Sequence, residues 1–226
     1  MALFSRIAAF QQRIRHGAHH HLGDAEGRFF ATMNLIVHDH VFLRRYWTNE
    51  WQVAPGVWRS NHPTHGRLER FAHLGVRSVI NLRGEPQEPS YLFETESCAQ
   101  FGMTLVTTKL NANKPPQREN LLRLFDLFRS VERPFMMHCK SGADRAGLAS
   151  ALYLLAHEGA DVETAKTQLH WRYLHLRRGK TGVLDHILDV YAARHASASI
   201  GIEDWVATEY DPQSIKQSYK RKRGLA

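Results

Sequence analysis

Cysteine is scarce in this 226-residue chain, which has only Cys98 and Cys139. Two cysteines exclude the disulfide framework of a small secreted domain and favour a reducing compartment. Long apolar runs are also missing. The longest candidate, from Leu148 to Ala156, is far shorter than the roughly 18 residues that a membrane-spanning helix needs. The first ten residues lack the apolar core of a secretion signal. We therefore expect a cytoplasmic protein.

Recognisable metal-binding and nucleic-acid-binding motifs are absent as well. The formal net charge of +8 suits anionic partners: phosphorylated substrates, an anionic membrane or nucleic acid. No zinc-finger or RNA-binding motif accompanies this charge, so nucleic acid has the least support of the three. The histidines at 16, 19–21, 38 and 40 suggest a metal site by composition alone. Adjacent histidines do not converge on one ion and no cysteine ligands accompany them, so we expect no metal.

Composition divides the chain into an N-terminal extension (1–50), a main domain (51–196) and a C-terminal extension with a basic tail (197–226). Between residues 3 and 14, apolar side chains recur near helical spacing with arginines between them. Such a segment either lies on an anionic membrane surface or packs on the domain as an ordinary amphipathic helix or loose terminus. We retain both interpretations, so peripheral contact with the inner membrane surface stays open.

The main domain alternates strand and helix patterns. β-branched and apolar runs predict strands at 57–60, 76–82, 103–108 and 135–138. Amphipathic or apolar stretches predict helices at 64–74, 90–101, 117–131 and 148–157, with two more between 161 and 195. This alternation predicts an α/β fold with a mostly parallel central sheet flanked by helices.

The segment that carries chemistry reads His-Cys-Lys-Ser-Gly-Ala-Asp-Arg, from His138 to Arg145. It lies between an expected strand and an expected helix, where backbone N–H groups and the positive helix end bind anions. The same field favours a nucleophilic thiolate at Cys139. The planar guanidinium of Arg145 can donate hydrogen bonds to two phosphate oxygens at once. Cys-x5-Arg alone is a weak indicator of a phosphate-binding loop. The expected strand before it and the expected helix after it make the indication more specific.

These residues resemble the cysteine-dependent protein tyrosine and dual-specificity phosphatase superfamily. The segments 55–63, 74–85 and 179–185 are also similar to compact dual-specificity-like phosphatases from bacteria, and the similarity spans about 39–212. The resemblance implies a phosphatase fold, hydrolysis of phosphomonoesters and no metal or organic cofactor. It implies Cys139 as nucleophile and Arg145 as phosphate ligand. Loop amides would come from Lys140, Ser141, Gly142, Ala143 and Asp144.

Two departures from that pattern concern catalysis. Many relatives have Ser or Thr after the arginine, to assist departure of the thiolate from the phosphoenzyme, whereas this chain has Ala146. Relatives also supply an aspartate, as general acid, from a loop about thirty residues before the cysteine. Residues 107–116 contain no carboxylate. Asp144 is our leading candidate for the acid, against the alternative of a structural salt bridge, and Glu85 and Glu88 are second choices.

The sequence therefore predicts a phosphatase that acts through a cysteinyl-phosphate on phosphotyrosine or phosphoserine/threonine proteins. A phosphorylated lipid or inositol headgroup is the competing substrate, supported by the basic surface and by Lys140 in the loop. A phosphate-binding module without turnover is the alternative that Ala146 and the missing aspartate suggest. A rhodanese-like sulfur carrier or an arsenate reductase would also place a cysteine in an anion-binding loop.

Overall fold

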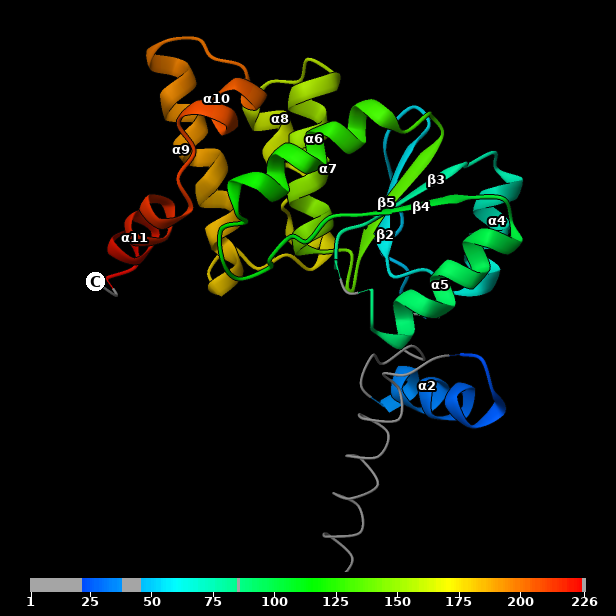
Figure 1. Ribbon diagram of the computed structural model, residues 1–226. Coiled ribbons are helices and arrows are strands. Elements are labelled where there is room, and N and C mark those ends of the chain that lie inside the picture. The colour runs from blue at the N-terminus through cyan, green and yellow to red at the C-terminus, as the bar shows by residue number, and fades with distance from the viewer. Residues whose placement is uncertain (1–21, 38–45, 85, 225–226) are drawn as a thin grey trace, which may run out of the picture.

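The computed structural model describes residues 22–37, 46–84 and 86–224, and Figure 1 shows their arrangement. Five strands form one sheet in the order β1-β2-β5-β3-β4. Their bounds are β1 Trp51–Ala54, β2 Val57–Asn61, β3 Ser78–Asn81, β4 Thr104–Thr107 and β5 Phe135–Cys139. β1 runs antiparallel to β2, and the other neighbouring pairs are parallel. The predicted mostly parallel sheet is confirmed, with the unforeseen β1 as its antiparallel edge.

Helices cover both faces of the sheet (Figure 1). The bounds are α2 Ala25–Val37, α4 His65–His73, α5 Pro89–Gln100, α6 Arg118–Ser130, α7 Asp144–His157, α8 Val162–Lys166, α9 Val183–Ser197, α10 Ile202–Thr208 and α11 Pro212–Lys222. On one side, α4 and α5 close a small apolar cluster that includes Phe71, Val79 and Met136. On the other, α6, α7, α9 and α10 bury a larger cluster around Phe125, Leu152 and other side chains. α2 lies against α5.

The central strands β3 and β5 are buried on both faces of the sheet. All four residues of β3 and all five of β5 are buried, as expected for central parallel strands. β5 lies between β2 and β3, so the segment that follows it leaves the middle of the sheet. In open α/β sheets, ligands bind at the carboxyl ends of such strands.

Two helices were expected between 161 and 195, and the structure has α8 and α9 there, of very different lengths. α9 is a long helix, but the first half contains the five-residue α8 and a 3-10 turn, Trp171–Tyr173. The side chain of His170 caps that turn by accepting from the Arg172 N–H, and Leu174 adopts a left-handed backbone at φ 59°. A left-handed residue ends a helix, so the chain turns back at this point.

Downstream of residue 197, α10 and α11 contribute side chains to the larger apolar cluster, among them Trp205, Tyr210 and Ile215. The division into an extension, a main domain and a second extension stays a prediction. The amphipathic pattern at 3–14 lies outside the described residues. Within the described ranges, no helix is both long and apolar enough to cross a membrane.

Candidate active site

The segment from Cys139 to Arg145 joins β5 to α7, as predicted. Cys139 is the last residue of β5, and Asp144 and Arg145 open α7. The loop therefore lies at the carboxyl edge of the sheet, against the N-terminus of a 14-residue helix (Figure 1). The unpaired N–H groups at that end carry a partial positive charge. An anion bound in the loop would meet both the amides and the helix end.

A backbone amide of the loop is directed at the sulfur of Cys139. The Gly142 N–H donates to Cys139 Sγ over 3.2 Å. Gly142 has φ +71°, and a Cβ built there would lie 2.6 Å from the backbone nitrogen of Asn61. Only glycine meets both conditions without strain. The close approach of the loop to β2 is what allows its amide to face the sulfur, and a donated hydrogen bond favours the thiolate.

Arg59, on β2, holds the loop from its outer side. Its guanidinium donates to the carbonyl oxygens of Gly142 at 2.7 Å and Ala143 at 3.1 Å, and it stacks 4.0 Å above the centre of the Tyr173 ring. Because these carbonyls point outward to Arg59, the N–H groups of the same planar peptide units point to the opposite side. Burial lowers the pKa of Arg59 to about 10. The Arg59 side chain is completely buried.

Two more segments bind the loop carbonyls. The Asn49 side-chain amide donates to Ser141 O over 3.1 Å and to Tyr173 O over 2.9 Å. The backbone N–H of His62 donates to Lys140 O over 3.4 Å. Four consecutive carbonyls, from residue 140 to 143, are thus engaged by groups outside the loop. This fixes the amide orientation before any ligand arrives, which is the preorganisation that anion stabilisation requires.

A buried ion pair lies directly behind the cysteine. His138 Nε2 and Glu94 Oε1 are 2.5 Å apart, with both side chains fully buried, and Asn81 donates to the other carboxylate oxygen over 2.6 Å. Burial alone would raise the pKa of Glu94, but the charges of His138 and His62 and these hydrogen bonds lower it to about 2. Glu94 therefore stays ionised and holds His138 in place.

His62, Glu94 and His138 form the one group of three potential metal ligands found in the described part of the chain, with ligating atoms within 4.8 Å of one another. Two imidazoles and a carboxylate would suit Zn²⁺. The Glu94 carboxylate, however, is already engaged by His138 and Asn81. The group is better described as a hydrogen-bonded support for β5. The histidines singled out in the sequence, 16, 19–21, 38 and 40, lie outside the described residues.

Asp144 is connected to a chain of charges that leads away from the loop. Its Oδ1 lies 2.7 Å from His175 Nδ1, His175 Nε2 lies 2.6 Å from Asp185 Oδ2, and Asp185 Oδ1 accepts from Arg177 Nε over 2.7 Å. Burial would lower the pKa of His175, but its hydrogen bonds to the two aspartates raise it to about 9. At neutral pH the imidazole is therefore a cation. It links Asp144 to α9.

The remaining predicted residues lie as follows. Arg145 is partly exposed, and within the described ranges no hydrogen bond or ion pair involves its guanidinium. Ser141 and Lys140 are also partly exposed, and the Ser141 hydroxyl accepts from the Ala143 N–H over 3.4 Å. Ala146 is fully buried. Glu88 is half-buried at the N-cap of α5, and position 85 falls outside the described residues.

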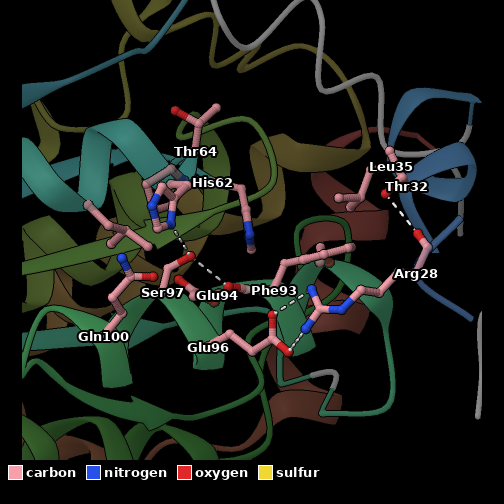
Figure 2. Close-up of a pocket in the computed structure, with 14 residues that line it drawn as sticks. Arg28, Thr32, Leu35, His62, Thr64, Phe93, Glu94, Glu96, Ser97 and Gln100 are labelled. Atoms are coloured by element: carbon pink, nitrogen blue, oxygen red, sulfur yellow. Dashed lines mark hydrogen bonds and ion pairs between the residues drawn. The ribbon is translucent and has the colours of Figure 1, made fainter. Parts of the chain in front are cut away.

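A separate cavity of about 420 Å³ opens between α2, the start of α4 and α5. Figure 2 shows Arg28 of α2 reaching across to Glu96, 2.6 Å away, while Glu94 and His62 line the wall nearer the sheet. None of the described lining residues belongs to the loop 139–145. The cavity is thus distinct from the loop 139–145 and adjoins it through the Glu94–His138 pair and through His62, whose backbone N–H donates to Lys140 O.

Glu94, Asn49 and Asp185 support the site, and the sequence analysis did not single them out. For Glu94 a signal existed: Ser90, Glu94, Ser97 and Cys98 fall on one helical face, and all four are buried. The side chain of Cys98 belongs to the small apolar cluster between the sheet and α5. A carboxylate on that buried face implies a charged partner. Asn49 and Asp185 gave no comparable signal, because their partners are distant in sequence.

A family model described as a DSP-PTPase phosphatase fused to NAD⁺ kinase matches residues 43–180. The dual specificity protein phosphatase TpbA of Pseudomonas aeruginosa (strain UCBPP-PA14) is 26% identical over 146 residues, which cover 64% of this chain and 60% of TpbA. The chain therefore spans less than two thirds of that relative's length.

Two solved structures share the fold. The crystal structure of P. aeruginosa TpbA superposes with a TM-score of 0.51 at 18% identity, covering 66% of this chain and 91% of that one. The core catalytic domain of the PP-IP phosphatase Siw14 from S. cerevisiae, in complex with citrate, gives a TM-score of 0.51 at 16% identity, with the same two coverages, 66% and 91%. At such identities the likeness concerns the fold alone.

Proposed function

The chain belongs to the family of DSP-PTPase phosphatases, and on that premise we propose that it hydrolyses phosphomonoesters on phosphotyrosine or phosphoserine/threonine proteins. The observation that carries the proposal is the orientation of the loop. On the outer side of the loop, Arg59 donates hydrogen bonds to the Gly142 and Ala143 carbonyls. On the inner side, the Gly142 N–H donates to the Cys139 sulfur. Such a loop favours both a thiolate and a phosphate dianion above it.

The proposed reaction has two steps. The Cys139 thiolate attacks phosphorus, an S–P bond forms, the P–O bond to the leaving group breaks, and its oxygen takes up a proton. Water then attacks the cysteinyl-phosphate, the S–P bond breaks, and thiolate and inorganic phosphate result. In both steps Arg145 would hold two equatorial oxygens while the amides of residues 140–144 hold the charge. Ala146 offers no hydroxyl to the departing thiolate, so we expect the second step to be slow.

Asp144 remains our proposed donor of the leaving-group proton. It opens α7 five residues after the nucleophile, and its side chain is 19% exposed. The ion pair with His175 is the main argument against this role, because it engages Asp144 Oδ1 at 2.7 Å from His175 Nδ1, in a chain of charges that leads to α9. Glu85 and Glu88 stay the second choices. The dependence of the rate on the leaving group tests Asp144 against Glu88.

Phosphate release from p-nitrophenyl phosphate tests the proposed activity. We expect turnover by the full chain, complete loss in Cys139→Ser, and loss of several orders of magnitude in Arg145→Ala, since one transition-state donor alone is worth about 10²–10³-fold. Binding of phosphate without turnover would instead identify a phosphate-binding module. Thiocyanate formation from thiosulfate and cyanide, or reduction of arsenate, would support the sulfur-carrier and arsenate-reductase alternatives.

A phosphorylated lipid or inositol headgroup is the second candidate substrate. The last turn of α11 is basic, with Lys220, Arg221 and Lys222, and Lys140 lies in the loop itself. Basic clusters of this kind attract anionic lipid surfaces. A panel of phosphopeptides and phospholipids with Cys139→Ser as the trap would decide between the substrates. For the proposed location at the inner membrane surface, sedimentation with anionic vesicles should depend on residues 1–16; no such dependence would count against it.

A further inference from the structure

A basic cavity lies beside α9 and α11, away from the sheet. Its volume is about 430 Å³, within the range of about 300–1,000 Å³ usual for small-molecule sites. Five basic side chains and two carboxylates line it, an excess of three positive charges. The charged residues are Lys166, Arg177, Arg178, Lys222, Arg223, Asp185 and Asp189. None of them belongs to the phosphate loop.

Close packing of the loop 177–182 against α11 builds the cavity. The Tyr219 hydroxyl donates to Gly179 O over 2.8 Å and so docks α11 on that loop. A Cβ at Gly182 would lie 1.9 Å from Arg177 O and 2.6 Å from the Tyr219 hydroxyl. Glycine is therefore required for this approach. α11 also packs along α9, so the cavity walls are held by three segments.

The two carboxylates of the cavity are each shared between two cations. Asp189 lies 3.0 Å from both Lys166 and Lys222, and Asp185 binds Arg177 and His175. Within this network the charges balance, because Lys166 also pairs with Glu163 and His175 also pairs with Asp144. The uncompensated positive charge comes from Arg178 and Arg223, because no ion pair or hydrogen bond joins either guanidinium to another residue of the described chain. Arg223 only stacks on the Tyr219 ring, 5.9 Å away.

We propose that this cavity is a second phosphate-binding site, which takes a phosphate group or polyphosphate of a ligand distinct from the one in the Cys139 loop. Arginine forks suit phosphate oxygens, and the clustered lysines add point charges. The uncompensated charge and the two unengaged guanidinium groups are the features that favour phosphate over a neutral ligand. The ligand is either a soluble phosphorylated compound or a phosphomonoester headgroup on a lipid surface, and the experiment separates them.

Arg177 connects this site to the loop. It lines the cavity and donates a hydrogen bond to Asp185. Asp185 is hydrogen-bonded to His175, and His175 is hydrogen-bonded to Asp144. A phosphate that draws Arg177 toward itself would release one hydrogen bond on Asp185.

Inorganic tripolyphosphate is the probe, and the full chain carrying Arg145→Ala is the protein, because that change weakens binding in the catalytic loop. By calorimetry at fixed salt, we expect one remaining site. Adding Arg178→Ala and Arg223→Ala should weaken it at least about tenfold, since hydrogen bonds to charged groups each contribute about 1.5–3 kcal/mol. The matched control, Arg77→Ala with Lys216→Ala, removes the same charge from exposed positions outside the cavity and should change affinity less than about twofold.

The proposal is overturned if no tripolyphosphate binds to the Arg145→Ala protein, or if the control pair weakens binding as much as the cavity pair. Vesicles containing phosphatidic acid form the second arm. If the cavity pair of substitutions abolishes both vesicle binding and tripolyphosphate binding, the ligand is a lipid headgroup. If it abolishes tripolyphosphate binding and leaves vesicle binding unchanged, the ligand is a soluble compound. Neither readout needs turnover, so the outcome is independent of whether the proposed phosphatase activity is found.

Discussion

At the scale of single residues, the ion pair of Glu94 and His138 bears directly on the proposed nucleophile, because His138 precedes Cys139 on β5. Both side chains are fully buried. A buried ion pair adds little net stability compared with apolar packing, but breaking it leaves an uncompensated charge in the interior. Its value lies in fixing where His138, and with it the start of the loop, is placed.

Glu94→Gln tests this role. We expect the free energy of unfolding to fall by about 3–5 kcal/mol, because the partner imidazole loses its counter-charge. The matched control is Glu96→Gln, two residues along α5, where the exposed pair with Arg28 should contribute about 1 kcal/mol or less. Urea unfolding of both variants measures the difference. Equal losses of unfolding free energy in the two variants would show that the buried pair contributes no more to stability than the exposed one.

Asp144→Asn distinguishes the acid role of Asp144 from a purely structural one. An alkyl leaving group needs protonation far more than p-nitrophenolate does, so loss of a general acid, about 10²–10⁴-fold, should appear mainly with alkyl phosphates. Steady-state kcat/KM on both substrate classes is the measurement. Equal losses on both would assign Asp144 to structure. Glu88→Gln serves as the parallel variant for the second-choice acid.

At the scale of elements, the loop depends on how closely it approaches β2. Gly142 lies so near Asn61 that any side chain would collide with the backbone of β2. Arg59, also on β2, donates hydrogen bonds to the loop carbonyls of Gly142 and Ala143. The strand thus acts as a template for the loop, and α7 supplies its positive end from the other side. Cys139 and Arg145 are positioned by these contacts.

Gly142→Ala should abolish most activity with only a moderate loss of stability. The added methyl group would lie 2.6 Å from Asn61 N, so the loop must move and its amide must leave the sulfur. We expect a loss of at least about 100-fold in kcat/KM, the worth of one oxyanion donor. Gly102→Ala is the control, since Gly102 also has positive φ, +65°, but no atom within 4 Å of the added carbon. It should cost about 1 kcal/mol of stability and leave kinetics unchanged; matching kinetic losses would refute the packing argument.

At the scale of the whole molecule, His175 joins the loop, the turn after Tyr173 and α9 through Asp144 and Asp185. The pKa of His175 in the folded protein is about 9, above its ordinary value of 6.5. A pKa raised by folding contributes stability that is complete below about pH 6.5 and is lost as the pH rises through about 9. The connection between these segments should therefore weaken in alkali.

Unfolding free energies measured in urea at several pH values between 6.5 and 9.5 test this connection. The unsubstituted protein should lose up to about 3 kcal/mol more than His175→Gln across the window, since each unit of pKa shift corresponds to about 1.4 kcal/mol. The comparison with the variant removes the contributions of other groups that titrate in the same range. Parallel pH profiles for the two proteins would exclude His175 as the source.

The local sequence determined much of this protein. The alternation of patterns predicted the α/β fold with its mostly parallel sheet, and Gly75 and Gly102 mark the ends of two helices with positive φ, +85° and +65°. The strand and helix around Cys139 and Arg145 were also predicted, because an apolar run, small residues and a second apolar run are all local signals. These features depend on neighbours in the chain.

The tertiary structure decided what surrounds the loop. Arg59 meets Gly142 and Ala143 across more than eighty residues of sequence, and His175 meets Asp144 across thirty-one. No periodicity or motif encodes such pairs, because they arise only when separate elements pack together. A charged side chain in a sequence reads as exposed by default. Arg59 is buried instead, because the loop carbonyls accept hydrogen bonds from its guanidinium and so offset the cost of removing that charge from water.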